Sequence, residues 1–89
     1  MYKIKQYSLD KALQANIQIQ PSQTGNFKID CFDQKGNFLA SIGDKRYSDF
    51  PTFMEEKGEA FALKKRDLYW KRHQNDSKIR GQLAKLILW

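Results

Sequence analysis

Apolar and polar residues alternate in three short segments of the chain, at 17–19, 27–32 and 38–42. Alternation of this kind is typical of β-strands that bury one face. Clusters of turn-forming residues separate the segments at 21–25 and 33–37. Short strands joined by such turns predict a three-stranded antiparallel meander.

One face of this predicted sheet is mostly apolar. Its members are Phe27, Ile29, Cys31, Phe38, Ala40 and Ile42. A small sheet of this kind is stable in water only when another element covers its apolar face. We therefore expect helices from the rest of the chain to pack on it.

The N-terminal segment, residues 1–16, predicts a short strand followed by a short helix. Residues 2–5 alternate as a strand does. Apolar residues then recur with helical spacing over residues 9–13. Ser8 is placed to cap this helix at its N-terminus, and Asn16 is placed to end it.

The segment 51–89 predicts two helices. Pro51 suits the start of a helix, and a main helix is expected over about residues 59–73. This helix carries two opposed apolar stripes, so we expect one to pack on the sheet and the other on the C-terminal segment or on a second molecule. Over residues 78–88, apolar side chains recur at i, i+4, i+7 and i+8, which predicts a C-terminal amphipathic helix.

A chain of 89 residues has room for one domain, and the pattern predicts the α+β class. The expected domain comprises an N-terminal strand and short helix (1–16), a β-meander (17–43) and a helical part (51–89). The basic helix and the amphipathic helix of the helical part are expected to pack on the meander. A single cysteine, Cys31, forms no internal disulfide and favours a reducing, intracellular location. The N-terminus lacks the apolar core of a signal peptide, and no apolar run approaches the ~18 residues of a membrane span, so we expect no membrane partner.

The net charge of +6 lies entirely in the C-terminal part of the chain. Residues 1–63 carry eight Lys or Arg and eight Asp or Glu, whereas residues 64–89 carry eight Lys or Arg and two Asp. The candidate anion-binding residues of the main helix are Lys64, Lys65, Arg66, Lys71, Arg72 and His73. Cations so arranged either bind nucleic-acid phosphates without sequence preference or form a solvated helix surface, and the pattern supports both. A histidine at the end of a helix also interacts favourably with the helix dipole.

Large apolar residues near the C-terminus predict a protein interface. The candidate contact residues are Leu63, Trp70, Leu86, Leu88 and Trp89. Chain ends fray unless they dock, so residues 86–89 either close the core over the meander or insert into a neighbouring subunit. Tyr69 and Trp70 lie within the basic run, where aromatic rings stack on single-stranded bases or, more commonly, form core and interface contacts.

The sequence contains no recognisable catalytic pattern. It has no glycine-rich phosphate loop, no nucleophile elbow and no HExxH motif. One histidine and one cysteine do not supply a standard zinc site. Asp49 is expected to cap a helix or to pair with Arg46 rather than to act as an acid or base. We therefore expect a non-enzymatic protein with no catalytic residues, no metal and no cofactor.

Several short motifs follow one another in residues 36–89. They are Gly43, Tyr47-Ser48-Asp49-Phe50, Arg66-x-x-Tyr69-x-x-Arg72-His73, Gly81 and Leu86-Ile87-Leu88-Trp89. In this order they resemble a group of small uncharacterised proteins of large DNA viruses and tailed phages, which share a GYSDY-like loop, a Y-x-x-R-H helix and an LLW-like end. The chain departs from that group at residues 54–58, which are less basic, and it stops at Trp89, where many of those proteins are longer. The resemblance implies a viral origin and a non-enzymatic, virion-associated or assembly-related role.

Two functional hypotheses follow from these patterns. The leading one is a small basic structural or assembly protein, viral and of the virion-associated or minor capsid type. It would bind other protein subunits through its apolar C-terminal end, in the host cytoplasm or nucleus during assembly and in the virion. The alternative is a nucleic-acid-binding module that contacts phosphates through its basic helix.

Overall fold

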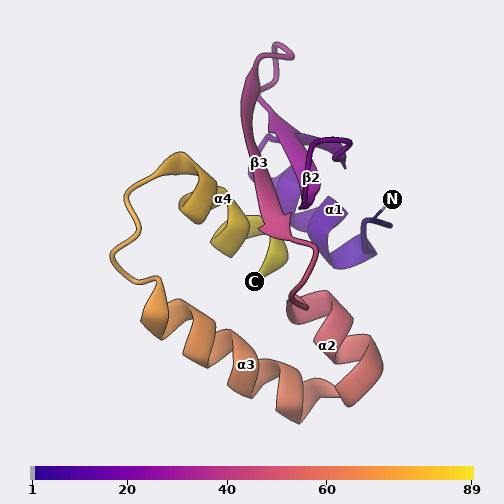
Figure 1. Cartoon of the computed structure of the whole chain (residues 1–89), viewed down its shortest axis with the longest axis vertical. Coiled ribbons are helices and arrows are strands. Elements are labelled where there is room, and N and C mark those ends of the chain that lie inside the picture. The colour runs from indigo at the N-terminus through magenta and orange to yellow at the C-terminus, as the bar shows by residue number, and fades with distance from the viewer. Residues whose placement is uncertain (1) are drawn as a thin grey trace.

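The computed structural model describes residues 2–89, which form four helices and a three-stranded antiparallel sheet (Figure 1). Along the chain the elements are α1 (Gln6–Gln14), β1 (Gln18–Pro21), β2 (Phe27–Phe32), β3 (Phe38–Asp44), α2 (Phe50–Lys57), α3 (Glu59–Arg72) and α4 (Ile79–Leu88). The strands are hydrogen-bonded in the order β1-β2-β3. The predicted α+β class and the predicted antiparallel meander are therefore confirmed.

The core lies between the sheet and helices α1 and α4. Its buried apolar members are Ala12, Ile29, Cys31, Ala40, Ile42, Leu83, Ala84, Ile87 and Leu88. Ile29 pairs with Ile42 and Cys31 with Ala40 across β2 and β3, so these four side chains share one face. Helix α4 packs on β3, and α1 packs on α4. The amphipathic C-terminal helix thus provides the cover that the apolar face requires.

One residue of the predicted apolar face lies elsewhere. The β2–β3 pairing shifts between Cys31 and Phe32, and this shift brings Phe38 opposite Phe32. An irregularity of this kind changes which face the following side chains occupy. The two rings make an edge contact at 5.7 Å between centroids, and Phe38 is exposed. The placement of Phe38 in the core was therefore wrong.

The N-terminal segment also differs from the prediction. Residues 2–5 form no strand, and α1 begins at Gln6 with Lys5 in the N-cap position. Ser8 is not the N-cap but a buried residue inside α1, where its hydroxyl donates a hydrogen bond to the Ile87 carbonyl at 2.9 Å. The serine that suggested a helix start instead joins α1 to α4. The helix ends at Gln14, close to the predicted position.

The basic helix α3 packs mainly on α2 rather than on the sheet. In Figure 1 it lies apart from the strands, at the far side of the molecule from the β2–β3 turn. The Phe53 ring of α2 lies 5.4 Å from the Phe61 ring of α3, and Tyr69 stacks on Trp89 at 4.3 Å. The stripe with Phe61 and Tyr69 therefore packs on α2 and on Trp89, and the prediction that one stripe packs on the sheet was wrong. The opposed stripe, with Leu63 and Trp70, is partly exposed.

Gly43 provides a test of how closely α4 packs on β3. Its φ is +76°, and a Cβ at this position would lie 2.6 Å from Cδ1 of the buried Leu88 side chain, which would have to shift within the core. We predict that Gly43→Ala lowers the free energy of unfolding, measured by urea denaturation, by more than the left-handed backbone strain of about 1–2 kcal/mol. Gly36→Ala is the control, because Gly36 has a φ of +86° but no atom within 4 Å of the added Cβ. Equal losses in the two variants would contradict the close packing of Leu88 on β3.

Candidate functional site

An open groove of about 1000 Å³ lies between the end of β3, helix α3 and the beginning of α4. Residues of β2, β3, the loop after β3, α2, α3 and α4 all contribute to its walls. Figure 1 shows how α2, α3, the connection to α4 and α4 itself follow one another in space below and beside the sheet. We call the open groove the central groove. It combines cationic and aromatic side chains.

Local chain geometry holds α3 away from the sheet and so opens the groove. Asp49 caps α2 by accepting the Thr52 N–H at 3.0 Å, and Pro51 begins the helix. Gly58, with a φ of +88°, then turns the chain from α2 into α3. At the other end, the Lys85 ammonium donates to the His73 carbonyl at 2.7 Å and ties the end of α3 to α4. Helix α3 is therefore held at both ends.

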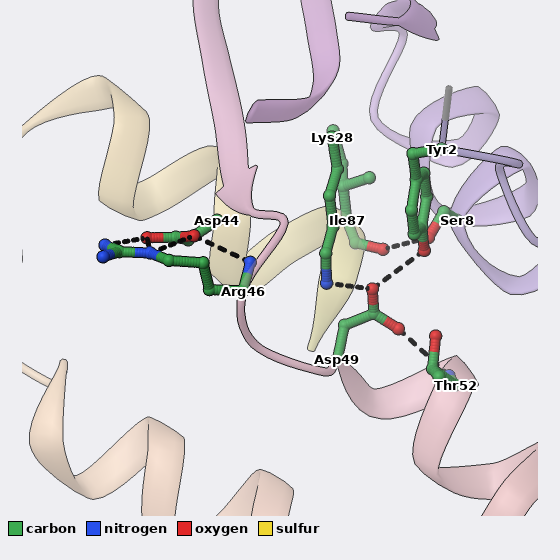
Figure 2. A network of polar contacts seen from close by, with 8 residues as sticks. All are labelled: Tyr2, Ser8, Lys28, Asp44, Arg46, Asp49, Thr52 and Ile87. Atoms are coloured by element: carbon green, nitrogen blue, oxygen red, sulfur yellow. Dashed lines mark hydrogen bonds and ion pairs between the residues drawn. The ribbon is translucent and has the colours of Figure 1, made fainter. Parts of the chain in front are cut away.

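The buried Asp49 carboxylate organises one wall of the groove (Figure 2). It is 1% exposed and accepts hydrogen bonds from the Lys28 ammonium and from the Tyr2 hydroxyl, both at 2.8 Å. Burial alone would raise the pKa of Asp49, but the hydrogen bonds from Lys28 and Thr52 outweigh it and hold the pKa below its usual value. Burial and the Asp49 charge raise the pKa of Tyr2. The predicted cap is confirmed, but the ionic partner is Lys28 rather than Arg46.

Every carboxylate that lines the groove has its own partner. Asp44 pairs with Arg46 at 2.7 Å, Asp49 with Lys28 at 2.8 Å and Asp76 with His73 at 2.9 Å. The bonds from Arg46 lower the pKa of Asp44 to about 2. Figure 2 shows the Asp44 and Asp49 pairs as two separate clusters. The acidic groups are therefore already engaged within the chain.

Four further cations line the same groove without a carboxylate partner. Lys65, Arg72, Lys78 and Arg80 take part in none of the ion pairs found among residues 2–89. Arg80 donates to the Ser41 carbonyl at 2.9 Å and lies over the Phe27 ring. The groove thus has an excess of positive charge that comes from α3 and from the first turn of α4.

The structure divides the six predicted anion-binding residues between different surfaces. Lys65, Arg72 and His73 line the central groove. Lys64 and Arg66 line a shallower hollow of about 450 Å³ together with Leu63 and Trp70. Lys71 is exposed and lies 3.6 Å from Asp67 on the same helix. The basic run is therefore not one continuous surface.

The predicted interface residues also separate. Leu63, Trp70 and Leu86 are 39%, 44% and 37% exposed, so they are accessible to a partner. Leu88 is 1% exposed and belongs to the core, because α4 packs it on β3 at Gly43. The assignment of Leu88 to a protein interface was therefore wrong. Trp89 is partly buried between Tyr69 and Phe53.

The groove contains one accessible aromatic ring that the sequence analysis did not identify as a site residue. Tyr69 lies between Trp89 and His73, whose rings are 4.3 Å and 4.2 Å away, so neither of its faces is free for a base. Tyr47, in contrast, is 68% exposed at the groove. Its position in the Tyr47-Ser48-Asp49-Phe50 motif was the only signal in the sequence that could have identified it. Lys78 and Arg80 were also missed, because they lie beyond the main basic run.

The described residues show no arrangement for metal binding or thiol chemistry. Residues 2–89 contain no group of three or more His, Cys, Asp or Glu placed to hold a metal ion. Cys31 is buried in the core, and burial raises its pKa to about 12, so the thiol stays protonated. Within the same residues, the helices are all too short or too polar to cross a membrane.

Comparisons of the chain with protein-family models, with curated proteins and with solved structures found no match. The resemblance to small proteins of DNA viruses and tailed phages therefore stays a prediction from the sequence motifs. In the structure these motifs have physical roles. Gly43 leaves space for the Leu88 side chain, Asp49 accepts the hydrogen bond of the buried Lys28, and Tyr47 lines the groove.

The lowered pKa of Asp49 predicts how stability depends on pH. Because the folded-state pKa lies below the unfolded value, the unfolded state binds the proton more readily, and this contribution to stability is lost as the pH falls from about 5 through the folded-state pKa. Asp49→Asn should lower the free energy of unfolding at neutral pH by about 3–5 kcal/mol, because it leaves the Lys28 ammonium buried without an anion. Urea denaturation at neutral and acidic pH should show a weaker pH dependence in the variant. An unchanged pH dependence would exclude Asp49 as its source.

Proposed function

We propose that this protein is a non-enzymatic nucleic-acid-binding protein that contacts phosphates with the cations of α3 and of the first turn of α4. The observation that carries this proposal is the charge balance of the central groove. Asp44 and Asp49 form ion pairs with Arg46 and Lys28, and Asp76 contacts the His73 ring, while the cations Lys65, Arg72, Lys78 and Arg80 have no carboxylate partner among residues 2–89. A polyanion would balance these charges.

The physical basis of such binding is electrostatic. Phosphate contacts need only cations that can reach the backbone, and they release condensed counterions from the nucleic acid. The net charge of +6 attracts a polyanion over longer distances as well. Residues 2–9 and the sheet contribute little to the cationic surface that would contact phosphates, because the excess positive charge of the chain lies in residues 64–89. The expected binding is sequence-tolerant and sensitive to salt.

Arg72→Gln tests this proposal. We predict that the variant binds DNA more weakly than the wild type and that the slope of log K against log salt concentration falls by about 0.7–0.9, as expected for one lost phosphate contact. Fluorescence anisotropy with a labelled oligonucleotide over a salt series measures both quantities. Lys35→Gln is the matched control, because Lys35 is an exposed cation in the distant β2–β3 turn. Association that does not depend on salt, or equal effects of the two substitutions, would contradict the proposal.

Protein assembly is the second candidate function, and the exposed apolar side chains of α3 support it. Leu63 and Trp70 line the hollow of about 450 Å³ on the side of α3 that carries Arg66. Tryptophan and arginine side chains are enriched in interface hot spots, and Trp70 and Arg66 both line this hollow. The hypothesis of docking through the C-terminal end is weakened, since Ile87 and Leu88 are buried in the core. A viral origin and a location in the host cell and the virion belong to this second proposal.

Trp70→Ala tests the assembly proposal. We predict that the wild-type chain self-associates as its concentration rises and that Trp70→Ala shifts this association to at least tenfold higher concentration, in line with a hot-spot loss of about 2 kcal/mol. Sedimentation velocity measures the mass in solution, and the DNA affinity of the variant should stay unchanged. Leu13→Ala serves as the control, because Leu13 is an exposed leucine on α1, outside the hollow. A chain that stays monomeric at all concentrations would exclude self-assembly.

A further inference from the structure

The central groove has the shape and the chemistry of a site for a single strand rather than a duplex. Its volume of about 1000 Å³ lies at the upper end of the range of about 300–1,000 Å³ typical of small-ligand pockets, so it accommodates a few nucleotides. A duplex presents its phosphates on a convex surface with the bases stacked inside. Such a surface cannot bring phosphates into a groove that is walled by β3, α3 and α4 together.

Tyr47 supplies a stacking surface that only an unpaired base can use. Tyr47 is 68% exposed, and the Arg46 guanidinium lies over one face of its ring at 5.7 Å from the centroid, which leaves the other face for a base. The faces of Tyr69, in contrast, are covered by Trp89 and His73. Unstacked bases of single strands bind to accessible aromatic side chains irrespective of sequence.

The loop after β3 fixes the position of Tyr47. The Asp44 carboxylate accepts hydrogen bonds from the backbone N–H of Arg46 at 2.8 Å and from its guanidinium at 2.7 Å. The Tyr47 N–H donates to the Asp44 carbonyl at 3.1 Å, and two residues further on Asp49 is buried in its network. Tyr47 is therefore exposed on an ordered turn, and little entropy is lost when a base stacks on it. The same ion pair neutralises Asp44, which would otherwise repel a phosphate.

The cations around the groove complete the site. Lys65 and Arg72 are seven residues apart on α3 and line the same wall, and Lys78 and Arg80 lie at the start of α4. Phosphates on either side of a base that stacks on Tyr47 would then meet positive charge from two helices.

We propose that the central groove binds single-stranded nucleic acid, with one base stacked on Tyr47 and the neighbouring phosphates held by Lys65, Arg72 and Lys78. This inference rests on the proposed nucleic-acid-binding function and deepens it by naming the form of nucleic acid and the residue that distinguishes it. It assigns a role to the exposed tyrosine of the Tyr47-Ser48-Asp49-Phe50 motif.

Two pairs of variants of the full chain test the inference, with fluorescein-labelled oligothymidylate of about ten nucleotides as the probe. Tyr47→Ala should weaken binding about tenfold, while Tyr47→Phe, which keeps the ring, should bind as the wild type does. The double variant Lys65→Gln/Arg72→Gln should lower the salt slope by about 1.4. Lys64→Gln/Lys71→Gln removes the same charge from the same helix outside the groove and should change the slope much less. Urea denaturation of each variant shows that it is folded.

The possible results separate this inference from the proposed function. Preference for the single strand over a duplex of equal length, with the effects above, supports the inference. Equal or tighter duplex binding, or equal effects of the two double variants, would overturn the groove site while leaving nucleic-acid binding by α3 in place. Failure to bind either form would overturn both. If thymidine monophosphate bound as tightly as oligothymidylate, the groove would be a pocket for a single nucleotide, and the proposal that it binds a strand would be overturned. Equal binding of polyglutamate would overturn the role of the base.

Discussion

A buried carboxylate without a partner is among the most costly features a small protein can contain, and the arrangement around Asp49 follows from that cost. Its oxygens accept from the N-terminal segment through Tyr2, from the sheet through Lys28 and from the first turn of α2 through Thr52. Three parts of the chain that are far apart in the sequence are thus joined at one charge. The direction in which the chain leaves β3, and so the position of α2 and α3, depends on this contact.

Helix α3 has little apolar contact with the rest of the molecule, and this has a physical consequence. Its only fully buried residue is Ala62. Its other contacts are mostly made by aromatic rings, including Phe61 with Phe53, Tyr69 with Trp89 and Arg66 over the Phe50 ring. A helix covered by a sheet would have hidden half of its cations and aromatic rings. Because α3 instead stands away from the sheet, it exposes one surface to the central groove and another to the hollow that contains Trp70. The two candidate functions use these two surfaces separately.

Local patterns predicted the parts of the fold that depend on neighbouring residues. Alternation and turn residues predicted the meander, and the spacing of Leu83 and Ile87 predicted α4, because each pattern lies within one element. The position of Phe38 depended on a shift in pairing, and the burial of Lys28 depended on Asp49, which is 21 residues away. Neither the pairing shift nor the burial of Lys28 can be recognised from the alternation or spacing of neighbouring residues.

The candidate site was predictable in part for the same reason. The cationic character of α3 is a local property, and the candidates that it provided include Lys65 and Arg72, which line the groove. The groove itself forms only when α4 folds back on β3, which brings Lys78 and Arg80 opposite α3 and the turn at Tyr47 between them. Such long-range proximity cannot be read from spacing along the chain.

The hydrogen bond between the Ser8 hydroxyl and the Ile87 carbonyl spans 79 positions of the chain. Helix α1 is synthesised before its packing partner α4, and the whole sheet lies between them in the sequence. The apolar face of the sheet is likewise covered by Leu83 and Ile87, which belong to α4. Native packing of α1 and of the sheet therefore requires that α4 has been synthesised, and until then the apolar face of the meander has no cover from α4.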